Sequence, residues 1–324
     1  MNRNIIYLSL LCIALLTALI CVPALAEAGR GGGIGGGIGG GIGGGRNADL
    51  SSILTVLLSV KYVLGGLAAL SGLILLKTTK INRNTRTLLM CAVFLLFGVL
   101  MVMHQPSPLR AVVDLVAALV SGGAITLRKA AMLVFIGGLS IIGSKLFCGW
   151  VCPFGALQEI VNRIPAPSGK KIKLPFRITN SVRVSLFVVS LIMILTTGND
   201  LYTYQDILNP FKLFGWRFEP VLAVLVGVVL IASVFVYRPF CYLICPVGLM
   251  TWLLEHVSIF RVRIDMERCN NCKKCLLKSR CPSVKAILDG GTLRPDCFAC
   301  GACIDACPRD ALAFEVWRDK DWQK

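Results

Sequence analysis

The sequence has few charged residues and almost no histidine. Only 16% of its 324 residues are charged, 56% are hydrophobic and the mean hydropathy is +0.74. These proportions exclude a mainly disordered chain and argue against a soluble enzyme. Two histidines and the lack of any Cys-x-x-Cys-His sequence exclude a multihaem cytochrome.

Acidic residues are also scarce, with 17 Asp and Glu against 34 Lys and Arg, which gives a formal net charge of +17. Such a balance is typical of nucleic-acid-binding proteins or of membrane proteins with basic cytoplasmic loops. The segment from residue 247 onward has 13 basic and 10 acidic residues, which is too balanced for a nucleic-acid-binding domain. We therefore expect membrane lipid, and no nucleic acid, as a partner.

The N-terminal region predicts a leader followed by a linker. Residues 1–26 combine basic Arg3, an apolar stretch and a small-x-small site at 24–26, a pattern typical of a secretory signal peptide. An uncleaved first membrane helix is the alternative. Residues 27–50 contain a GGGI repeat with almost no side chains to pack, so they predict a flexible linker.

Five apolar segments follow, several of them near the lower length limit for crossing about 30 Å of hydrocarbon. A sixth segment, 111–124, is too short to span and predicts an interfacial or re-entrant helix. The five predicted spans are 53–76, 87–103, 130–147, 182–197 and 221–237.

Loop charges predict the orientation of these spans. Loops 77–86 and 153–183 are basic, whereas loop 198–220 has more acidic than basic residues, so the first two belong in the cytoplasm. A cleaved signal peptide and five spans also place the C-terminus in the cytoplasm. We therefore expect a multi-pass protein of the bacterial cytoplasmic (inner) membrane.

The cysteines carry the clearest motifs, because twelve of the fifteen fall into four groups. One group is Cys297-x2-Cys300-x2-Cys303-x3-Cys307-Pro, the spacing of bacterial ferredoxins, in which the fourth cysteine ligates the other cluster. The companion group is Cys269-x2-Cys272-x2-Cys275-x5-Cys281-Pro. We expect two [4Fe–4S] clusters with crossed ligands: Cys269, Cys272, Cys275 and Cys307 for cluster one, and Cys297, Cys300, Cys303 and Cys281 for cluster two.

Other uses of these cysteines are less consistent with the pattern. Zinc ribbons also contain Cys-x2-Cys pairs, but two Cys-x2-Cys-x2-Cys runs that each end in Cys-Pro favour iron–sulfur clusters. Disulfides do not suit a reducing cytoplasm.

The remaining two groups are a repeated CxxxCP motif. Cys148 and Cys152 form one copy, and Cys241 and Cys245 form the other, 93 positions later. A spacing of four places both thiols on one face of a helix, and the following proline is expected to end that helix. These four thiols are candidates for a redox-active or metal-binding group, and buried inert thiols are the alternative.

From residue 87 to its end, the chain resembles the NapH/NosR-type membrane ferredoxins. The resemblance rests on four spans, CGWVCPFG at 148–155, CYLICPVG at 241–248 and the two cluster motifs. It implies a polytopic α-helical membrane protein with a C-terminal α+β bacterial-type 2[4Fe–4S] ferredoxin domain. It also implies a four-span membrane domain at 87–258 and a ferredoxin-type domain at 259–324. The extra transmembrane helix with its basic cytoplasmic loop at 51–86 departs from the family pattern and is predicted from hydropathy and charge.

The same resemblance implies an electron-transfer subunit of a quinol dehydrogenase-type oxidoreductase. Electrons would pass between the quinone pool, the cytoplasmic clusters and a partner redox protein, such as a cytochrome or a periplasmic reductase or dehydrogenase system. A second hypothesis, suggested by a similar family, is copper reduction or enzyme maturation, with the CxxxCP thiols handling the metal. A redox sensor or scaffold is the third.

Overall fold

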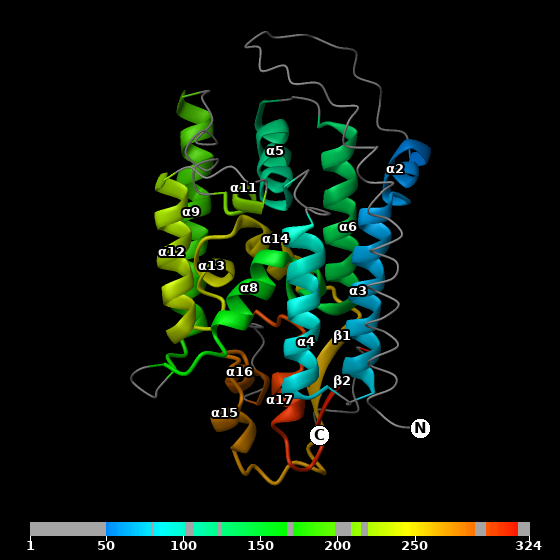
Figure 1. The fold of residues 1–324 in the computed structure, drawn as a ribbon, viewed down its shortest axis with the longest axis vertical. Helices are drawn as coiled ribbons and strands as arrows, with labels where there is room; N and C mark the ends of the chain where they lie inside the picture. The colour runs from blue at the N-terminus through cyan, green and yellow to red at the C-terminus, as the bar shows by residue number, and fades with distance from the viewer. Residues whose placement is uncertain are drawn as a thin grey trace.

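The computed structural model describes residues 50–78, 81–100, 107–121, 125–166, 171–197, 209–214, 220–288 and 296–316. The predicted signal peptide and most of the glycine-rich linker lie outside these ranges. The described chain is mostly helical, with one small sheet (Figure 1). The helical architecture that the sequence predicts is therefore confirmed.

Long helices run side by side along the long axis of the molecule (Figure 1). They coincide with the predicted apolar segments, and the shorter α5 (Pro108–Ser121) coincides with the predicted interfacial helix. The long helices are α3 (Val60–Lys77), α4 (Arg83–Val93) with its π-helical continuation η1 (Phe94–Val99), α6 (Leu127–Gly143), α9 (Phe176–Thr197) and α12 (Pro220–Phe235).

Within the described residues, one helix is long and apolar enough to cross a membrane, namely α3. Helix α12 is apolar but has only 16 residues. The predicted span at 53–76 is not one continuous helix, because a turn at 58–59 separates α2 (Leu50–Leu57) from α3. Many large apolar side chains on the outer faces of α3, α9 and α12 are exposed.

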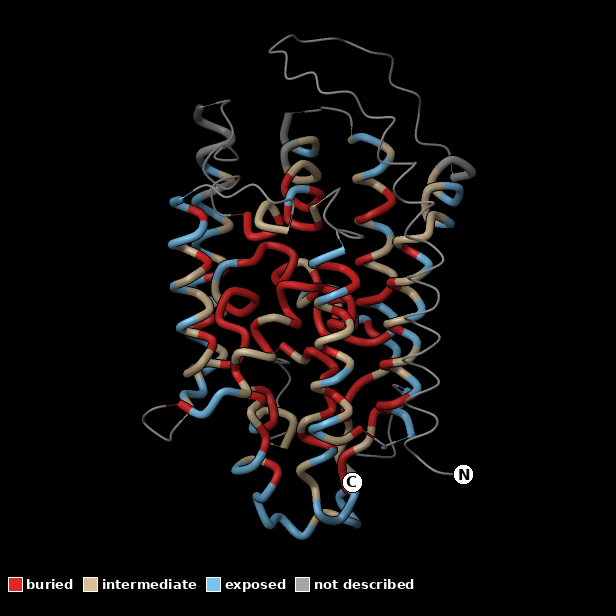
Figure 2. The backbone as a smooth tube through the Cα atoms, in the orientation of Figure 1, coloured by how far each residue is buried: buried red, intermediate tan, exposed pale blue. Residues whose placement is uncertain are grey.

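Four short helices fill the middle of the bundle, where most of the backbone is buried (Figure 2). They form two successive pairs, α7 (Leu146–Trp150) with α8 (Pro153–Val161) and α13 (Pro239–Leu243) with α14 (Pro246–Glu255). Each CxxxCP motif spans the junction within one pair. The two motifs thus adopt the same local fold.

The prediction that each CxxxCP pair lies on one helix face is wrong. Cys152 has φ −68° and ψ 115°, an extended conformation, and it immediately precedes α8. Cys245 has the same extended conformation, with φ −71° and ψ 118°, and immediately precedes α14. The cause is the proline, which disfavours a helical conformation for the preceding residue and suits the first position of a new helix.

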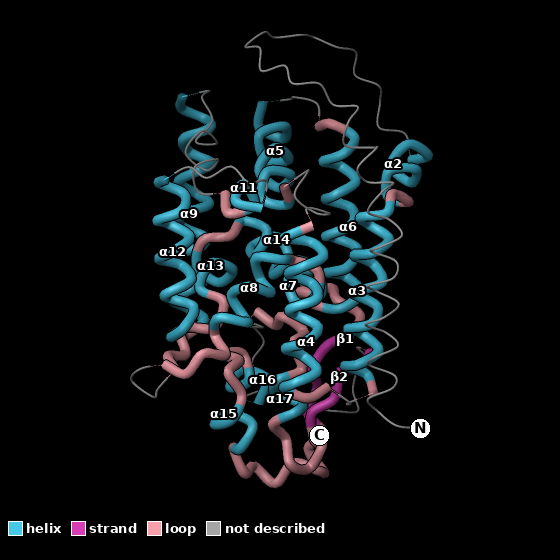
Figure 3. The backbone as a smooth tube through the Cα atoms, in the orientation of Figure 1, coloured by secondary structure: helices cyan, strands magenta, loops and turns pink. Residues whose placement is uncertain are grey.

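The C-terminal part contains the sheet and three short helices. Strand β1 (Phe260–Ile264) pairs antiparallel with β2 (Leu312–Val316), with Val262 opposite Phe314 (Figure 3). In the sequence, the two strands are separated by α15 (Lys274–Lys278), α16 (Val284–Leu288) and α17 (Ala302–Asp305). This compact unit follows α14 almost directly, which fixes it against one end of the helical bundle.

Candidate metal centre

The structure brings together the four cysteines of the first predicted ligand set. Cys269, Cys272, Cys275 and Cys307 all line one pocket, although Cys307 is far from the others in sequence. Asn271 and Lys273 have left-handed backbones, with φ near +53° and +54°, and they turn the chain around this pocket. Thiolates are the protein ligands of [4Fe–4S] clusters, so this donor set fits the predicted cluster one.

The second ligand set also lies together. The thiols of Cys281 and Cys300 form a hydrogen bond, and Cys297 and Cys303 are close enough to act electrostatically on Cys281. The hydrogen bond with Cys281 and the charge of Arg86 lower the pKa of Cys300, against the effect of its burial. The same hydrogen bond raises the pKa of Cys281, and burial raises the pKa of Cys297 and of Cys303.

The cysteines of each crossed set thus lie near one another, and their ligation of a cluster stays a prediction. Among the described residues, no group of three or more His, Cys, Asp or Glu side chains is arranged to hold a metal ion. The residues that line the first pocket include four cysteines and no His, Asp or Glu.

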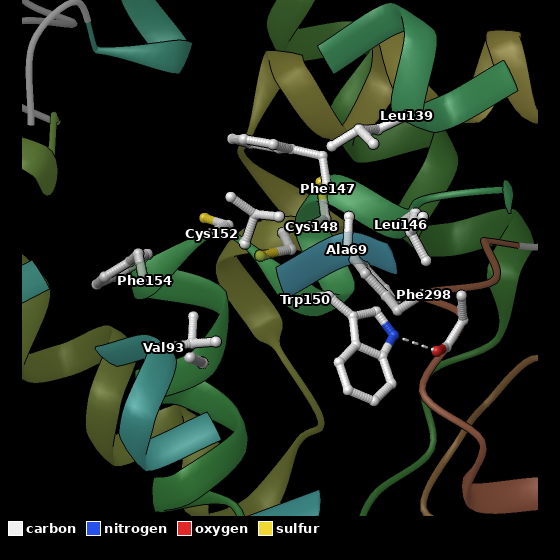
Figure 4. Packing of buried hydrophobic residues seen from close by; sticks show 14 of the residues in the cluster. Ala69, Val93, Leu139, Leu146, Phe147, Cys148, Trp150, Cys152, Phe154 and Phe298 are labelled. Carbon is white, nitrogen blue, oxygen red and sulfur yellow. Dashed lines mark hydrogen bonds between the residues drawn. The ribbon is translucent and has the colours of Figure 1, made fainter. Parts of the chain in front are cut away.

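The four CxxxCP thiols lie in the protein core. Their residues are between 5% and 8% exposed. Cys152 lies within electrostatic reach of Cys148, Cys241 and Cys245, so the two repeats place their thiols in one region. Figure 4 shows Cys148 and Cys152 surrounded by apolar side chains. The amide of Gln158 donates to the sulfur of Cys241 at 3.5 Å.

Each repeat also holds the other through a basic side chain three positions before its first cysteine. Lys145 precedes Cys148, and its Nζ donates to the carbonyl of Gly248 at 2.7 Å. Arg238 precedes Cys241, and its Nη1 donates to the carbonyl of Cys148 at 2.5 Å. Sequence reasoning missed these two residues, although both occupy the same position of the repeat and therefore carried a usable signal.

A buried carboxylate joins the second ligand set to the helical bundle. Asp296, directly before Cys297, is fully buried and pairs with Lys145 Nζ at 2.5 Å and with Arg183 Nη1 at 2.9 Å. Its backbone carbonyl accepts hydrogen bonds from Tyr242, at 3.2 Å, and from Ser283. The sequence pattern gave no indication of this pairing.

The loop between Cys297 and Cys300 rests directly on the first CxxxCP loop. Trp150 Nε1 donates to the carbonyl of Ala299 at 2.8 Å (Figure 4). Phe298 is 1% exposed, and its ring lies near two cations, 5.2 Å from Lys145 Nζ and 5.1 Å from Arg238 Cζ. The loop that carries Cys297 and Cys300 is therefore in contact with the CxxxCP region through backbone and aromatic groups.

A second buried network forms around Glu159. Its carboxylate accepts from Arg86 Nε at 2.8 Å, from Arg238 Nη2 at 2.5 Å and from the hydroxyl of Tyr237 at 3.0 Å. Burial raises the pKa of Glu159, but the guanidinium groups of Arg86 and Arg238 outweigh it and hold that pKa well below its usual range. Glu159 is therefore ionised and is a counter-charge that Arg86 and Arg238 share.

The close contact between Gly149 and Phe298 predicts a sensitive position. A Cβ added at Gly149 would overlap the carbonyl oxygen of Phe298, which is backbone and cannot rotate away. We expect Gly149→Ala to lower the free energy of unfolding by about 1–3 kcal/mol, the usual effect of overpacking. Gly138→Ala is the matched control, because nothing lies within 4 Å of its added Cβ. Equal denaturant midpoints for the two variants would contradict this packing.

Comparison with known proteins defines the class. The family described as "4Fe-4S binding domain" matches the chain twice, at residues 129–175 and 218–265. Each match contains one CxxxCP motif, which confirms that the motif is part of an internal repeat, and the cysteines from Cys269 onward lie outside both matches. These matches and the helical fold indicate an iron–sulfur protein of the ferredoxin type.

Individual relatives make the relationship more specific. The chain is 27% identical to the ferredoxin-type protein NapH of Haemophilus influenzae, over 60% of this chain and 69% of NapH. It is 26% identical to YccM of Escherichia coli, over 64% of this chain and 62% of YccM. It is also 26% identical to the regulatory protein NosR of Stutzerimonas stutzeri, over 50% of this chain and 23% of NosR.

These relatives confirm the resemblance to the NapH/NosR-type ferredoxins, and they support iron–sulfur electron transfer. The alignments cover only part of each protein, less than two thirds of YccM and about a quarter of NosR. No solved structure gives a significant match.

Proposed function

We propose that this protein is a membrane-bound electron-transfer subunit that passes electrons between the quinone pool and a partner redox protein. Two [4Fe–4S] clusters, held by the crossed cysteine sets, would supply one-electron transfer at the cytoplasmic side of a multi-pass membrane domain. The relatives supply the iron–sulfur part of this proposal, and the quinone and the membrane topology follow from the resemblance and from the loop charges.

One observation carries the proposal. Cys307 is 32 positions after Cys275 in sequence, yet it lines the same pocket as Cys269, Cys272 and Cys275. Such a crossed arrangement is typical of two-cluster ferredoxins. Nothing in the spacing of a single motif requires it.

The contacts of Asp296, Phe298 and Ala299 support a path for electrons between the second ligand set and the helical bundle. They hold the loop of cluster two against the CxxxCP repeats, and so against the part that we place in the membrane. Burial of this contact excludes water from the space between the two regions. The chain thereby positions its own redox groups, which is the role of a protein around a redox cofactor.

Quinol titration tests the quinone link. We expect a reduced quinol analogue, added anaerobically to the protein in lipid nanodiscs, to reduce the clusters and change their EPR signal. Dithionite reduction of the same sample is the control for intact clusters. Clusters that dithionite reduces and quinol leaves oxidised would contradict the quinone link.

Copper reduction or maturation is the second candidate, because four thiols converge in one region. Their burial argues against it, since residues that are 8% exposed or less offer little access to a metal ion from solution. The test is reoxidation of the reduced clusters by Cu²⁺. Reoxidation that is lost in Cys148→Ala or Cys241→Ala would favour this second function over the first.

A further inference from the structure

A basic cavity of about 280 Å³ lies beside the second ligand set, between the start of α4, the end of α8 and the unit that contains α15 and α17. Two cysteines of that set, Cys281 and Cys300, are part of its lining. It is separate from the pocket of the first set. The function proposed above does not use it.

The lining of the cavity carries an excess of positive charge. Apart from the two cysteines, five basic and two acidic side chains line the cavity, an excess of three positive charges. The basic residues are Arg83, Arg86, Arg163, Lys278 and Arg280, and the acidic ones are Glu159 and Asp305. The carboxylate of Glu159 already accepts hydrogen bonds from Arg86 and from Arg238, and Arg238 is not part of the lining.

The arginines are close enough to repel one another. Arg83, Arg163 and Arg280 all belong to the lining of this one cavity, so their like charges lie close together. The side chain of Arg83 is exposed and has no hydrogen-bond partner among the described residues. Like charges this close destabilise a protein unless an anion lies among them.

Arg86, one of the lining residues, also has an unused buried donor. Arg86 is 3% exposed, and its Nε and Nη2 bind Glu159 and the carbonyl of Gly149. Its third nitrogen, Nη1, is buried and has no hydrogen-bond partner within the described part of the chain. A buried donor without a partner costs about 1–3 kcal/mol, so such donors in native proteins usually have a ligand or water.

We propose that this cavity binds a phosphate-bearing ligand beside the second cysteine set. Guanidinium groups match the oxygens of phosphate in paired hydrogen bonds. A phosphate also offers more anionic oxygens to several guanidinium groups at once than a single carboxylate does. The phosphate belongs either to an anionic phospholipid headgroup or to a soluble phosphate compound. Basic pockets at the cytoplasmic ends of membrane helices bind such headgroups.

The test uses the full-length protein, purified anaerobically with its iron, in two arms. In the first, pyrophosphate is titrated calorimetrically into delipidated protein in detergent. In the second, native mass spectrometry counts bound phosphatidylglycerol after reconstitution in nanodiscs of phosphatidylglycerol and phosphatidylcholine. Arg83→Gln and Lys278→Gln each remove one exposed charge from the lining. Lys285→Gln removes one exposed charge outside the lining and is the matched control.

We expect binding in at least one arm, with a dissociation constant about tenfold higher in Arg83→Gln, as loss of a charge-assisted hydrogen bond implies. Lys285→Gln should bind like the wild type, and iron content should be equal in all variants. If Arg83→Gln weakens the binding of pyrophosphate alone, the ligand is a soluble phosphate compound. If it weakens the binding of phosphatidylglycerol alone, the ligand is a lipid headgroup. Absence of binding in both arms, or equal binding by Arg83→Gln and Lys285→Gln, would overturn the proposal.

Discussion

Replacing Cys307 with alanine is expected to remove about half of the protein-bound iron, since each [4Fe–4S] cluster needs its four thiolates. The residue lines the pocket of Cys269, Cys272 and Cys275, so its loss should abolish cluster one and leave cluster two. Iron and acid-labile sulfide per chain, measured after anaerobic purification, check this expectation. The sheet-and-helix unit should also lose stability, because metal ligation contributes to folding.

Cys91→Ala is the matched control for this change. Cys91 lies in α4, half-buried and outside every cysteine motif. The iron content of the Cys91→Ala variant should equal that of the wild type. A Cys307→Ala variant that keeps all of its iron would show that Cys307 is no ligand, and the crossed assignment would fail with it.

The second large effect is expected at Asp296. Asp296→Asn removes a buried carboxylate and leaves the buried cations of Lys145 and Arg183 without their counter-charge. Breaking a buried ion pair in this way typically costs about 3–5 kcal/mol. We expect a much lower midpoint in denaturant unfolding, together with release of the C-terminal unit from the bundle in limited proteolysis.

The same substitution at an exposed position supplies the comparison. Asp310 is exposed, and its side chain has no ion pair or hydrogen bond among the described residues. Its left-handed backbone, φ +50°, suits asparagine. Asp310→Asn should change stability by less than about 0.5 kcal/mol. If Asp296→Asn were equally mild, the ion pairs would not hold the two parts together.

Hydropathy predicted the helices well, because helix formation depends largely on local sequence, whereas the cluster ligands stay predictions. The apolar segments became helices α3, α4, α6, α9 and α12, and Cys307 lines the pocket of the first motif, as crossed ligation requires. The signal peptide prediction lies outside the described residues. The positions of the domain boundaries stay predictions.

Two features escaped the sequence for physical reasons. The i, i+4 interpretation of CxxxCP ignored the effect of proline on the preceding residue, which placed Cys152 and Cys245 outside the first helix. The pairing of Asp296 with Lys145 joins positions 151 apart, so only the tertiary fold determines it. Lys145 and Arg238, by contrast, occupy matching positions of the repeat, and comparison of the two copies could have identified them.

The most direct test of the central claim is the iron and acid-labile sulfide content of the anaerobically purified wild-type protein. Two [4Fe–4S] clusters predict about eight iron and eight sulfide per chain. A higher iron count would place a further cluster at the four CxxxCP thiols. Stoichiometric zinc without iron would contradict the account, because the crossed cysteine sets would then be zinc sites and the electron-transfer proposal would have no redox centre.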